Sequence, residues 1–334
     1  MPSREELLRA GIKKDHKIIE IGPSYNPLTP KSGGWRSYVV DHTDRDGLIN
    51  KYRDVSLANV DSIETVDFVW MQGPLSDCVP VEHHGTFDIF VASHVFEHVP
   101  DLVGALRSAE VLCRSDAKMV LALPDKRVCF DYFRPQSTTG DAIAAHWERR
   151  SRHSSKTLWD HFAYTALKHG GPGWGRTDST PAVLIHSIDQ AANWAKRHDA
   201  EAYIDAHAWT FVPASFSLIM LELAYLGLTD WEVERTQTAE YTEFYVWLRR
   251  GALARVAGIS QVDLTAERTR LLNELMFELA EQRLQFAVRE HSGSARTLEQ
   301  AKRSLIKVIG SDRASRARSA LRRFLGSPAN ATDV

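Results

Sequence analysis

Several features that would point to common protein classes are scarce or missing in this chain of 334 residues. Its only cysteines, Cys78, Cys113 and Cys129, are too widely spaced for a disulfide framework or a zinc motif. No apolar run reaches the ~18 residues of a transmembrane helix, and the charged first residues predict no secretory signal. No G-x-G-x-x-G loop of dinucleotide-binding enzymes follows a strand. We therefore expect a cytoplasmic protein and disfavour a Rossmann-like dehydrogenase.

The net charge is also small, at −2 overall, but the charged residues are unevenly distributed along the chain. Residues 296–323 hold nine Lys and Arg against Glu299 and Asp312, so the rest of the chain is acidic. An acidic body disfavours nucleic acid as the main ligand. Hydrophobic content of 43% and charged content of 25% are typical of an ordinary globular protein.

The first 125 residues alternate between short apolar runs and helical stretches. The clearest helix is predicted over 101–113, where Asp101 is a suitable N-cap. Such alternation predicts a parallel sheet that is buried on both faces. The five predicted strands are 17–22, 38–41, 66–70, 87–92 and 118–123.

A different pattern follows in the second half of the chain. Residues 213–226 predict an amphipathic helix, and 231–237 and 243–250 predict an antiparallel pair of strands. Together with the first five strands, this pair completes an α/β fold, a Rossmann-like seven-stranded mostly parallel sheet with helices on both faces and a helical C-terminal extension. The predicted organisation is a main domain at 1–250 with a substrate-side insertion at 125–212, a helical extension at 251–326 and disorder at 327–334.

The helical extension contains two stretches with different surfaces. Residues 264–290 predict a helix with one leucine-rich side, which is able to pair two chains into a homodimer. Residues 296–325 predict a basic amphipathic helix. A helix of this kind can lie on the anionic inner face of a membrane, dock on a partner protein or stay solvated, and the sequence leaves these alternatives open.

Ligands of open α/β sheets bind outside the carboxyl ends of the strands, so the residues just past each strand are the informative ones. Asp41 ends the second strand about 20 residues after the first turn, where a carboxylate can accept both hydroxyls of an adenosine ribose. An acid at a strand end is also a common turn former. Gly22 allows the backbone to approach a ligand closely.

Four stretches carry a resemblance to a known family: EIG after the first strand, VVDH after the second, FDIFVASHVFEHVPDLVGALRSAEVL and LPDKRVCFDYFRPQSTTG. Over roughly residues 15–250 the chain resembles class I S-adenosylmethionine-dependent methyltransferases of the type 11/12 kind. The last stretch is similar to a narrower bacterial group linked to surface-polysaccharide assembly. The resemblance implies methyl transfer with S-adenosylmethionine as the cofactor.

The resemblance also assigns cofactor-binding positions. It places Glu20 and Gly22 at the methionine part of the cofactor and Asp41 at the ribose, with Ser93 and His94 lining the cofactor beneath the substrate. One departure is clear, because the family's loop has two or three glycines where this chain has GPSYNP. The full set of predicted cofactor-binding residues is Glu20, Gly22, Pro23, Asp41, Asp67, Phe68, Ser93 and His94.

Methyl transfer to oxygen is an in-line displacement in which the protein aligns the acceptor and removes its proton. Asp125 follows the fifth strand, and Lys126 and Arg127 beside it suit a polar or anionic acceptor such as a sugar phosphate. The same run also fits a helix cap with a solvated basic turn. The candidate bases are Asp125, His94, His98, His153, His161 and His207. The predicted acceptor-binding residues are Lys126, Arg127, Arg134 and Trp209.

The function predicted from these features is O-methylation of a sugar or polysaccharide-linked acceptor, either a small molecule or a glycan. A metal site made by Asp125, His161 and His207 is conceivable, but no spacing establishes it, so no metal is predicted. The main alternative is a non-catalytic scaffold that keeps the sheet and recruits polysaccharide enzymes or membrane through its C-terminal helices. Methylation of nitrogen or carbon in a small molecule is a further alternative.

Overall fold

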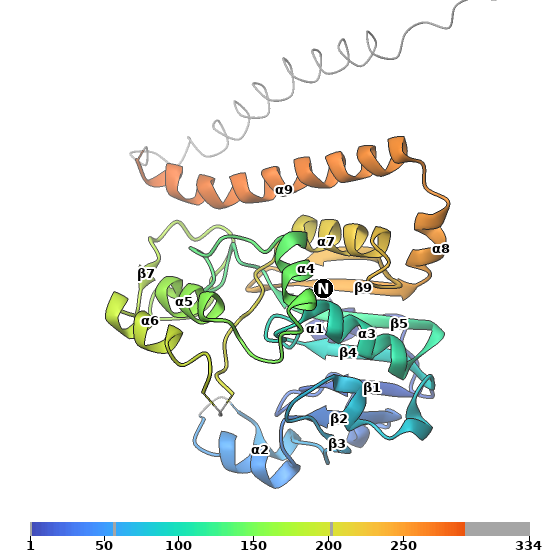
Figure 1. Cartoon of the computed structure of the whole chain (residues 1–334). Helices are drawn as coiled ribbons and strands as arrows, with labels where there is room; N and C mark the ends of the chain where they lie inside the picture. Colours follow the sequence, from blue (N-terminus) through green and yellow to red (C-terminus); the bar gives the residue numbers. More distant parts are fainter. Residues whose placement is uncertain (1, 56–57, 201–202, 291–334) are drawn as a thin grey trace, which may run out of the picture. The chain divides into compact units, whose positions relative to one another are not determined.

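A single seven-stranded sheet organises the chain (Figure 1). The computed structural model describes residues 2–55, 58–200 and 203–290. The strand order is β3-β2-β1-β4-β5-β9-β8, with β1 to β5 parallel and β9 antiparallel to both of its neighbours. This order confirms the Rossmann-like, mostly parallel sheet. The strands are β1 Ile18–Ile21, β2 Ser37–Asp41, β3 Phe68–Val69, β4 Phe87–Ser93, β5 Cys113–Pro124, β8 Trp231–Thr238 and β9 Glu243–Arg250.

Helices cover this sheet, and several begin where the sequence predicts. The 101–113 helix is confirmed as α3, and its N-cap Asp101 accepts a hydrogen bond from the Gly104 amide at 2.9 Å. The predicted helix at 213–226 is confirmed as α7, with Pro213 in its first turn. The helices of the sheet domain are α1 Arg4–Leu8, α2 Arg45–Tyr52, α3 Leu102–Leu112, α4 Thr139–Trp147 and α7 Pro213–Tyr225.

Each face of the sheet has its own apolar core. One core joins the sheet to α3, α4 and α7, and its centre includes Phe90, Phe216 and Phe244, none of which is exposed. The core on the other face includes Leu8 of α1 packed with Val91 of β4. Burial on both faces explains why the inner strands β1, β4 and β9 are mostly apolar, whereas edge strand β8 carries several exposed or half-exposed polar residues.

The predicted insertion at 125–212 forms a small layer of its own, with α5 and α6 side by side (Figure 1). Phe162 and Trp194 stack between these two helices at 4.6 Å. Gly173 of the glycine-rich loop fits against the turn between β8 and β9, where an added Cβ would lie 2.0 Å from Thr242 Cγ2. Besides α4, its elements are α5 Ser155–Tyr164, β6 Ala166–Leu167, β7 Val183–Leu184 and α6 Ile188–Ala195.

The helical extension begins with α8 Ala252–Ala257 and continues as α9 Gln261–Glu290. The compact unit around the sheet extends to Glu281, beyond the residue 250 expected from the sequence, and the domain assignment itself stays a prediction. Among residues 2–55, 58–200 and 203–290, no helix is both long and apolar enough to cross a bilayer. The predicted basic helix at 296–325 and the predicted disorder at 327–334 lie outside the described residues.

The leucine-rich side of α9 is covered within the chain. Leu264 and Leu271 pack against Leu218 and Leu221 of α7, and Leu275 packs against the start of the same helix. The leucine-rich side of α9 therefore has its cover in α7 and gives no independent support for the pairing of two chains. A homodimer stays a prediction without this support.

Loss of Leu271 should destabilise the protein, because its side chain is only 5% exposed in the seam between α7 and α9. We expect Leu271→Ala to lower the free energy of unfolding by about 2–4 kcal/mol through lost burial and a residual cavity. Leu272 is 45% exposed and provides the matched control, with an expected loss of about 0.5 kcal/mol or less. Urea denaturation of the full chain measures both, and equal losses would contradict the packing described.

Candidate functional site

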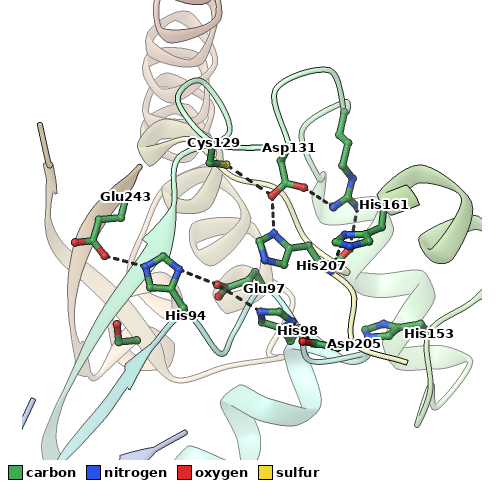
Figure 2. Close-up of polar contacts among 12 residues, drawn as sticks. His94, Glu97, His98, Cys129, Asp131, His153, His161, Asp205, His207 and Glu243 are labelled. Atoms are coloured by element: carbon green, nitrogen blue, oxygen red, sulfur yellow. Dashed lines mark hydrogen bonds and ion pairs between the residues drawn. The ribbon is translucent and has the colours of Figure 1, made fainter. Parts of the chain in front are cut away.

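Polar side chains gather at the carboxyl edge of the sheet, starting at the end of β4 (Figure 2). His94 follows Ser93 with a φ of 56°, a left-handed conformation that few non-glycine residues adopt. Its Nε2 lies 2.9 Å from Glu243 Oε2 and its Nδ1 lies 3.2 Å from Glu97 Oε1. Burial alone lowers the pKa of His94, but the two carboxylates raise it to about 9. The His94 ring is therefore an imidazolium at neutral pH.

Arg4 of α1 holds Glu243, the carboxylate that contacts His94 Nε2. Its Nε donates to Glu243 Oε1 at 2.6 Å, and its Nη2 donates to Glu243 Oε2 at 2.9 Å and to Ser93 Oγ at 2.7 Å. Burial alone raises the pKa of Glu243, but the hydrogen bonds from His94 and Arg4 hold it at about 2. The N-terminal helix thus ties the ends of β4 and β9 together with a bidentate ion pair.

Glu97 is fully buried at this edge, with 0% exposure, as is Asp125 after β5. Neither of its side-chain oxygens has a hydrogen-bond partner among the described residues. Beyond His94, the nearest imidazole nitrogen is His98 Nε2, 3.8 Å from Glu97 Oε1. The Glu97 carbonyl accepts the amides of Ala208 at 2.6 Å and Trp209 at 3.1 Å. These two main-chain bonds bring the end of the insertion, and with it His207, beside Glu97.

His207 is held by residues of the insertion. Its Nδ1 lies 2.6 Å from Oδ2 of buried Asp131, whose other oxygen accepts a hydrogen bond from Arg134 Nη1 at 2.7 Å. Arg134 Nη2 also donates to the His207 carbonyl at 2.9 Å. Burial alone raises the pKa of Asp131, but His207 and Arg134 hold it well below its usual range. Arg134 therefore positions His207 through Asp131, whereas the sequence placed it among the acceptor-binding residues.

His161 and His153 lie in the layer built by the insertion. Burial lowers the pKa of His161 to about 3 and that of His153 to about 4, so both imidazoles are neutral. His161 Nδ1 accepts the main-chain amide of His207 at 3.1 Å. This bond gives His161 a supporting role, which differs from the catalytic role predicted for it.

Asp125 does not take the position expected of a base. It is fully buried, and Arg127 donates to both of its oxygens at 2.8 and 2.6 Å. Arg176 adds a third contact at 2.7 Å. Burial alone raises the pKa of Asp125, but these guanidinium groups lower it. Asp125 is therefore an internal partner of Arg127 and Arg176, and Arg127 also pairs with Glu281 at 3.1 Å.

Two further residues predicted to bind the acceptor are also inside the protein. Lys126 is 4% exposed and donates to the Tyr132 carbonyl at 3.3 Å. Trp209 is 3% exposed, belongs to the main core, and donates from Nε1 to the Val99 carbonyl at 2.6 Å. Trp209 is therefore a residue of the main core.

The predicted cofactor residues lie at the ends of β1 and β2. Buried Glu20 accepts the amides of Leu28 at 2.5 Å and Thr29 at 2.9 Å, so it shapes the loop after β1 from inside. Burial raises the pKa of Glu20, although these hydrogen bonds oppose the shift. Gly22 has a φ of 61°, and an added Cβ would lie 2.8 Å from Val95 Cγ2. Only glycine therefore fits where this loop crosses the turn after β4.

Asp41 lies at the end of β2 beside the same loop. Its Oδ2 accepts the Ser24 amide at 3.0 Å, and its Oδ1 accepts the His42 amide at 2.8 Å. The His42 ring also lies 2.7 Å from Oδ1 and is itself 47% exposed. Asp67, one of the predicted cofactor-binding residues, accepts the Val39 amide at 2.6 Å and pairs with Lys31 at 2.6 Å. The roles of Asp67, Phe68 and Pro23 stay predictions.

The sequence did not single out several residues that build this site. Glu97 stands next to the candidate base His98 in the quoted EHVPD stretch, and that adjacent pair was the one available signal. The other missed residues come from distant parts of the chain with no local pattern to mark them. They are Arg4, Asp131, Asp205 and Glu243.

Comparison with known proteins gives a limited result. No family model matches this sequence, and no curated protein matches it. One similar solved structure is an S-adenosylmethionine-dependent methyltransferase from Aquifex aeolicus, which is 11% identical in sequence and has a TM-score of 0.38. The alignment covers 74% of this chain and 88% of that chain. A methyltransferase from Mesorhizobium loti has 12% identity, 74% and 99% coverage and a TM-score of 0.38. A putative zinc-dependent alcohol dehydrogenase from Rhodobacter sphaeroides has 13% identity, 75% and 91% coverage and a TM-score of 0.39. At these scores the likenesses decide nothing about function, which has to be argued from the site.

The buried neutral His153 should make the protein less stable in acid. Its folded pKa of about 4 lies below the ordinary value, so the unfolded chain binds the proton first as pH falls. The stability that neutral His153 contributes is present above pH ~6.5 and is lost as pH falls toward 4. When the pH falls from 7 to 5, the free energy of unfolding of His153→Gln should decrease by about 2 kcal/mol less than that of the wild type, as measured by urea denaturation.

The control for this measurement is His198→Gln, because His198 is exposed. This variant should lose as much stability between pH 7 and 5 as the wild type does. If His153→Gln follows the wild type as well, His153 is not the buried neutral group described.

Proposed function

We propose that this protein is an S-adenosylmethionine-dependent methyltransferase that methylates a hydroxyl of a sugar or polysaccharide-linked acceptor. The sheet supports a class I methyltransferase over a dehydrogenase. A dinucleotide-binding sheet has the order 3-2-1-4-5-6 with parallel strands, whereas here antiparallel β9 lies between β5 and β8. The seven-stranded sheet with an antiparallel pair is the arrangement that the resemblance to class I methyltransferases implies.

Asp41 is the observation that carries the cofactor proposal. It ends β2 beside the first loop, the position from which a carboxylate accepts ribose hydroxyls in doubly wound sheets. A carboxylate has about four lone-pair sites. Two are taken by the amides of Ser24 and His42. The exposed His42 ring and the Ser24 hydroxyl occupy the other two, at 2.7 and 3.5 Å, so both would turn away when two ribose hydroxyls bind.

The loop after β1 supplies the second support. Gly22 and Ser24 both have left-handed backbones, with φ of 61° and 49°. The Ser24 amide points to Asp41, and the carboxylate of Glu20 holds the far end of the loop. The GPSYNP loop is therefore held by internal hydrogen bonds where the family's loop uses several glycines. We infer that it presents a preformed edge to the cofactor.

The acceptor side of the proposal rests on the cluster after β4. His94, His98 and Glu97 follow the strand next to β1, so we infer that a cofactor bound at Asp41 and Ser93 would have its methyl group on their side. A sulfonium methyl needs only an aligned acceptor that gives up its proton. Imidazole and carboxylate groups provide the polar surroundings for that proton loss. The sugar as acceptor rests on the resemblance of the sequence alone.

Binding of S-adenosylhomocysteine tests the cofactor proposal without knowledge of the acceptor. Isothermal titration calorimetry on the full chain should give micromolar affinity for the wild type. Asp41→Ala should weaken binding roughly 10-fold or more, because hydrogen bonds to a charged group contribute about 1.5–3 kcal/mol. Asp46→Ala, an exposed acid on nearby α2, serves as the control and should bind as the wild type does.

The opposite result is equally clear. If the wild type shows no heat of binding and no thermal stabilisation with S-adenosylhomocysteine, the methyltransferase proposal fails. The alternative of a non-catalytic scaffold then becomes the better account. Equal weakening by Asp41→Ala and Asp46→Ala would instead contradict the position given to the ribose.

A further inference from the structure

We propose that Glu97, His98 and His207 form a binding site for a divalent transition-metal ion. Each of the three offers one ligand atom, and these atoms all lie within 4.8 Å of one another. Figure 2 shows their side chains converging from two parts of the chain, the turn after β4 and the end of the insertion. Ligand bonds of ~2.1 Å place neighbouring ligand atoms roughly 3–3.5 Å apart, so small side-chain rotations close the set around an ion.

The burial of Glu97 is an independent observation that points to a cation. A carboxylate removed from water is costly unless it is paired or coordinates a metal. Glu97 is 0% exposed, and its two oxygens make no hydrogen bond to any residue in the described part of the chain. Its ion-pair contacts are with His94 Nδ1 at 3.2 Å and His98 Nε2 at 3.8 Å, and both are made by Oε1. A bound cation would satisfy this group directly.

A hydrogen bond to Asp131 holds His207 in the orientation that a metal ligand requires, and an ion-pair contact with Asp205, whose side chain is 74% exposed, lies beside His98. His207 Nδ1 lies 2.6 Å from Asp131 Oδ2, and His98 Nδ1 lies 2.8 Å from Asp205 Oδ1. A carboxylate on one ring nitrogen fixes the tautomer and leaves Nε2 as the donor to a metal. His98 Nε2 is the atom that lies 3.8 Å from Glu97 Oε1. One hydrogen-bonded pair, Asp131 with His207, and one ion-pair contact, Asp205 with His98, thus lie beside the buried carboxylate of Glu97.

The donor set indicates the kind of ion. Two imidazoles and one carboxylate suit Zn²⁺, Fe²⁺, Mn²⁺ or Co²⁺, whereas Mg²⁺ and Ca²⁺ prefer oxygen ligands. Three protein ligands also leave coordination positions for water or substrate. The open side is where His98 is 27% and His94 41% exposed, in contrast to the nearly buried His207 at 6%. A substrate oxygen can reach the ion from that side.

The chemical role of the ion rests on the proposed function, although the metal site itself does not. A metal-bound hydroxyl ionises more readily, because the cation stabilises the alkoxide. The acceptor hydroxyl would release its proton to solvent and keep both electrons of the O–H bond. The acceptor oxygen would then bond to the methyl carbon as the carbon–sulfur bond breaks, and the electron pair of the carbon–sulfur bond would stay on sulfur, which becomes a neutral thioether. The acceptor class this implies is a hydroxyl compound able to bind a metal ion, such as a sugar with neighbouring hydroxyls.

Titration with Co²⁺ tests the site directly on full-length protein that carries no histidine tag and has been treated with chelator. The wild type should bind one equivalent and develop visible ligand-field absorption. Glu97→Gln, which keeps the shape of the side chain, and His207→Gln should each weaken binding at least about 100-fold, because each removes one of three ligands. Asp131→Asn should weaken it about 10- to 100-fold as a residue that orients a ligand.

His153→Gln is the matched control, because His153 is a buried histidine of the same region outside the three ligands. It should bind Co²⁺ as the wild type does. The proposal is overturned if the wild type shows no Co²⁺ absorption or thermal stabilisation, or if Glu97→Gln binds as well as the wild type. S-adenosylhomocysteine binding measured in the presence of chelator separates this outcome from failure of the proposed function, since it does not require the ion.

Discussion

The structure around the carboxyl edge of the sheet depends on one buried carboxylate, that of Glu97. A charged group at 0% exposure imposes strict demands on its neighbours. The turn after β4 places His94, in a left-handed conformation, in ion-pair contact with this carboxylate. The main-chain carbonyl of Glu97 separately accepts two amides from the segment that carries His207. One residue thereby joins the sheet to the end of the insertion.

The insertion provides the support for this arrangement. Asp131 and Arg134 form a buried pair that orients His207, and Asp125 is clamped by Arg127 and Arg176. These ion pairs are inside the protein, where removal of one partner leaves an uncompensated charge. The charged run after β5 is therefore the frame that positions the histidines. In the proposed function, the acceptor would bind on the open side of this frame, next to His94 and His98.

The sequence predicted the sheet well, because periodicity and strand-end turns are local signals. All seven strands of the sheet and the helices α3 and α7 are confirmed, with β3 shorter than expected and β5 beginning at Cys113, directly after α3. The candidate site was predicted less completely. The adjacent Glu97 and His98 stood in a visible motif, but their pairing with His207 depends on main-chain bonds between segments far apart in the chain. Charge alone also could not show that Asp125 and Arg127 would pair with each other.

A crystal structure with S-adenosylhomocysteine and Mn²⁺ is the most direct test of the whole account. Anomalous scattering at the manganese edge locates the ion without assumptions about its ligands. The account predicts the ribose at Asp41 and a single anomalous peak bounded by Glu97, His98 and His207, within reach of the cofactor's sulfur through one acceptor oxygen. A cofactor bound elsewhere, or an anomalous peak at other residues with none between these three, would contradict it.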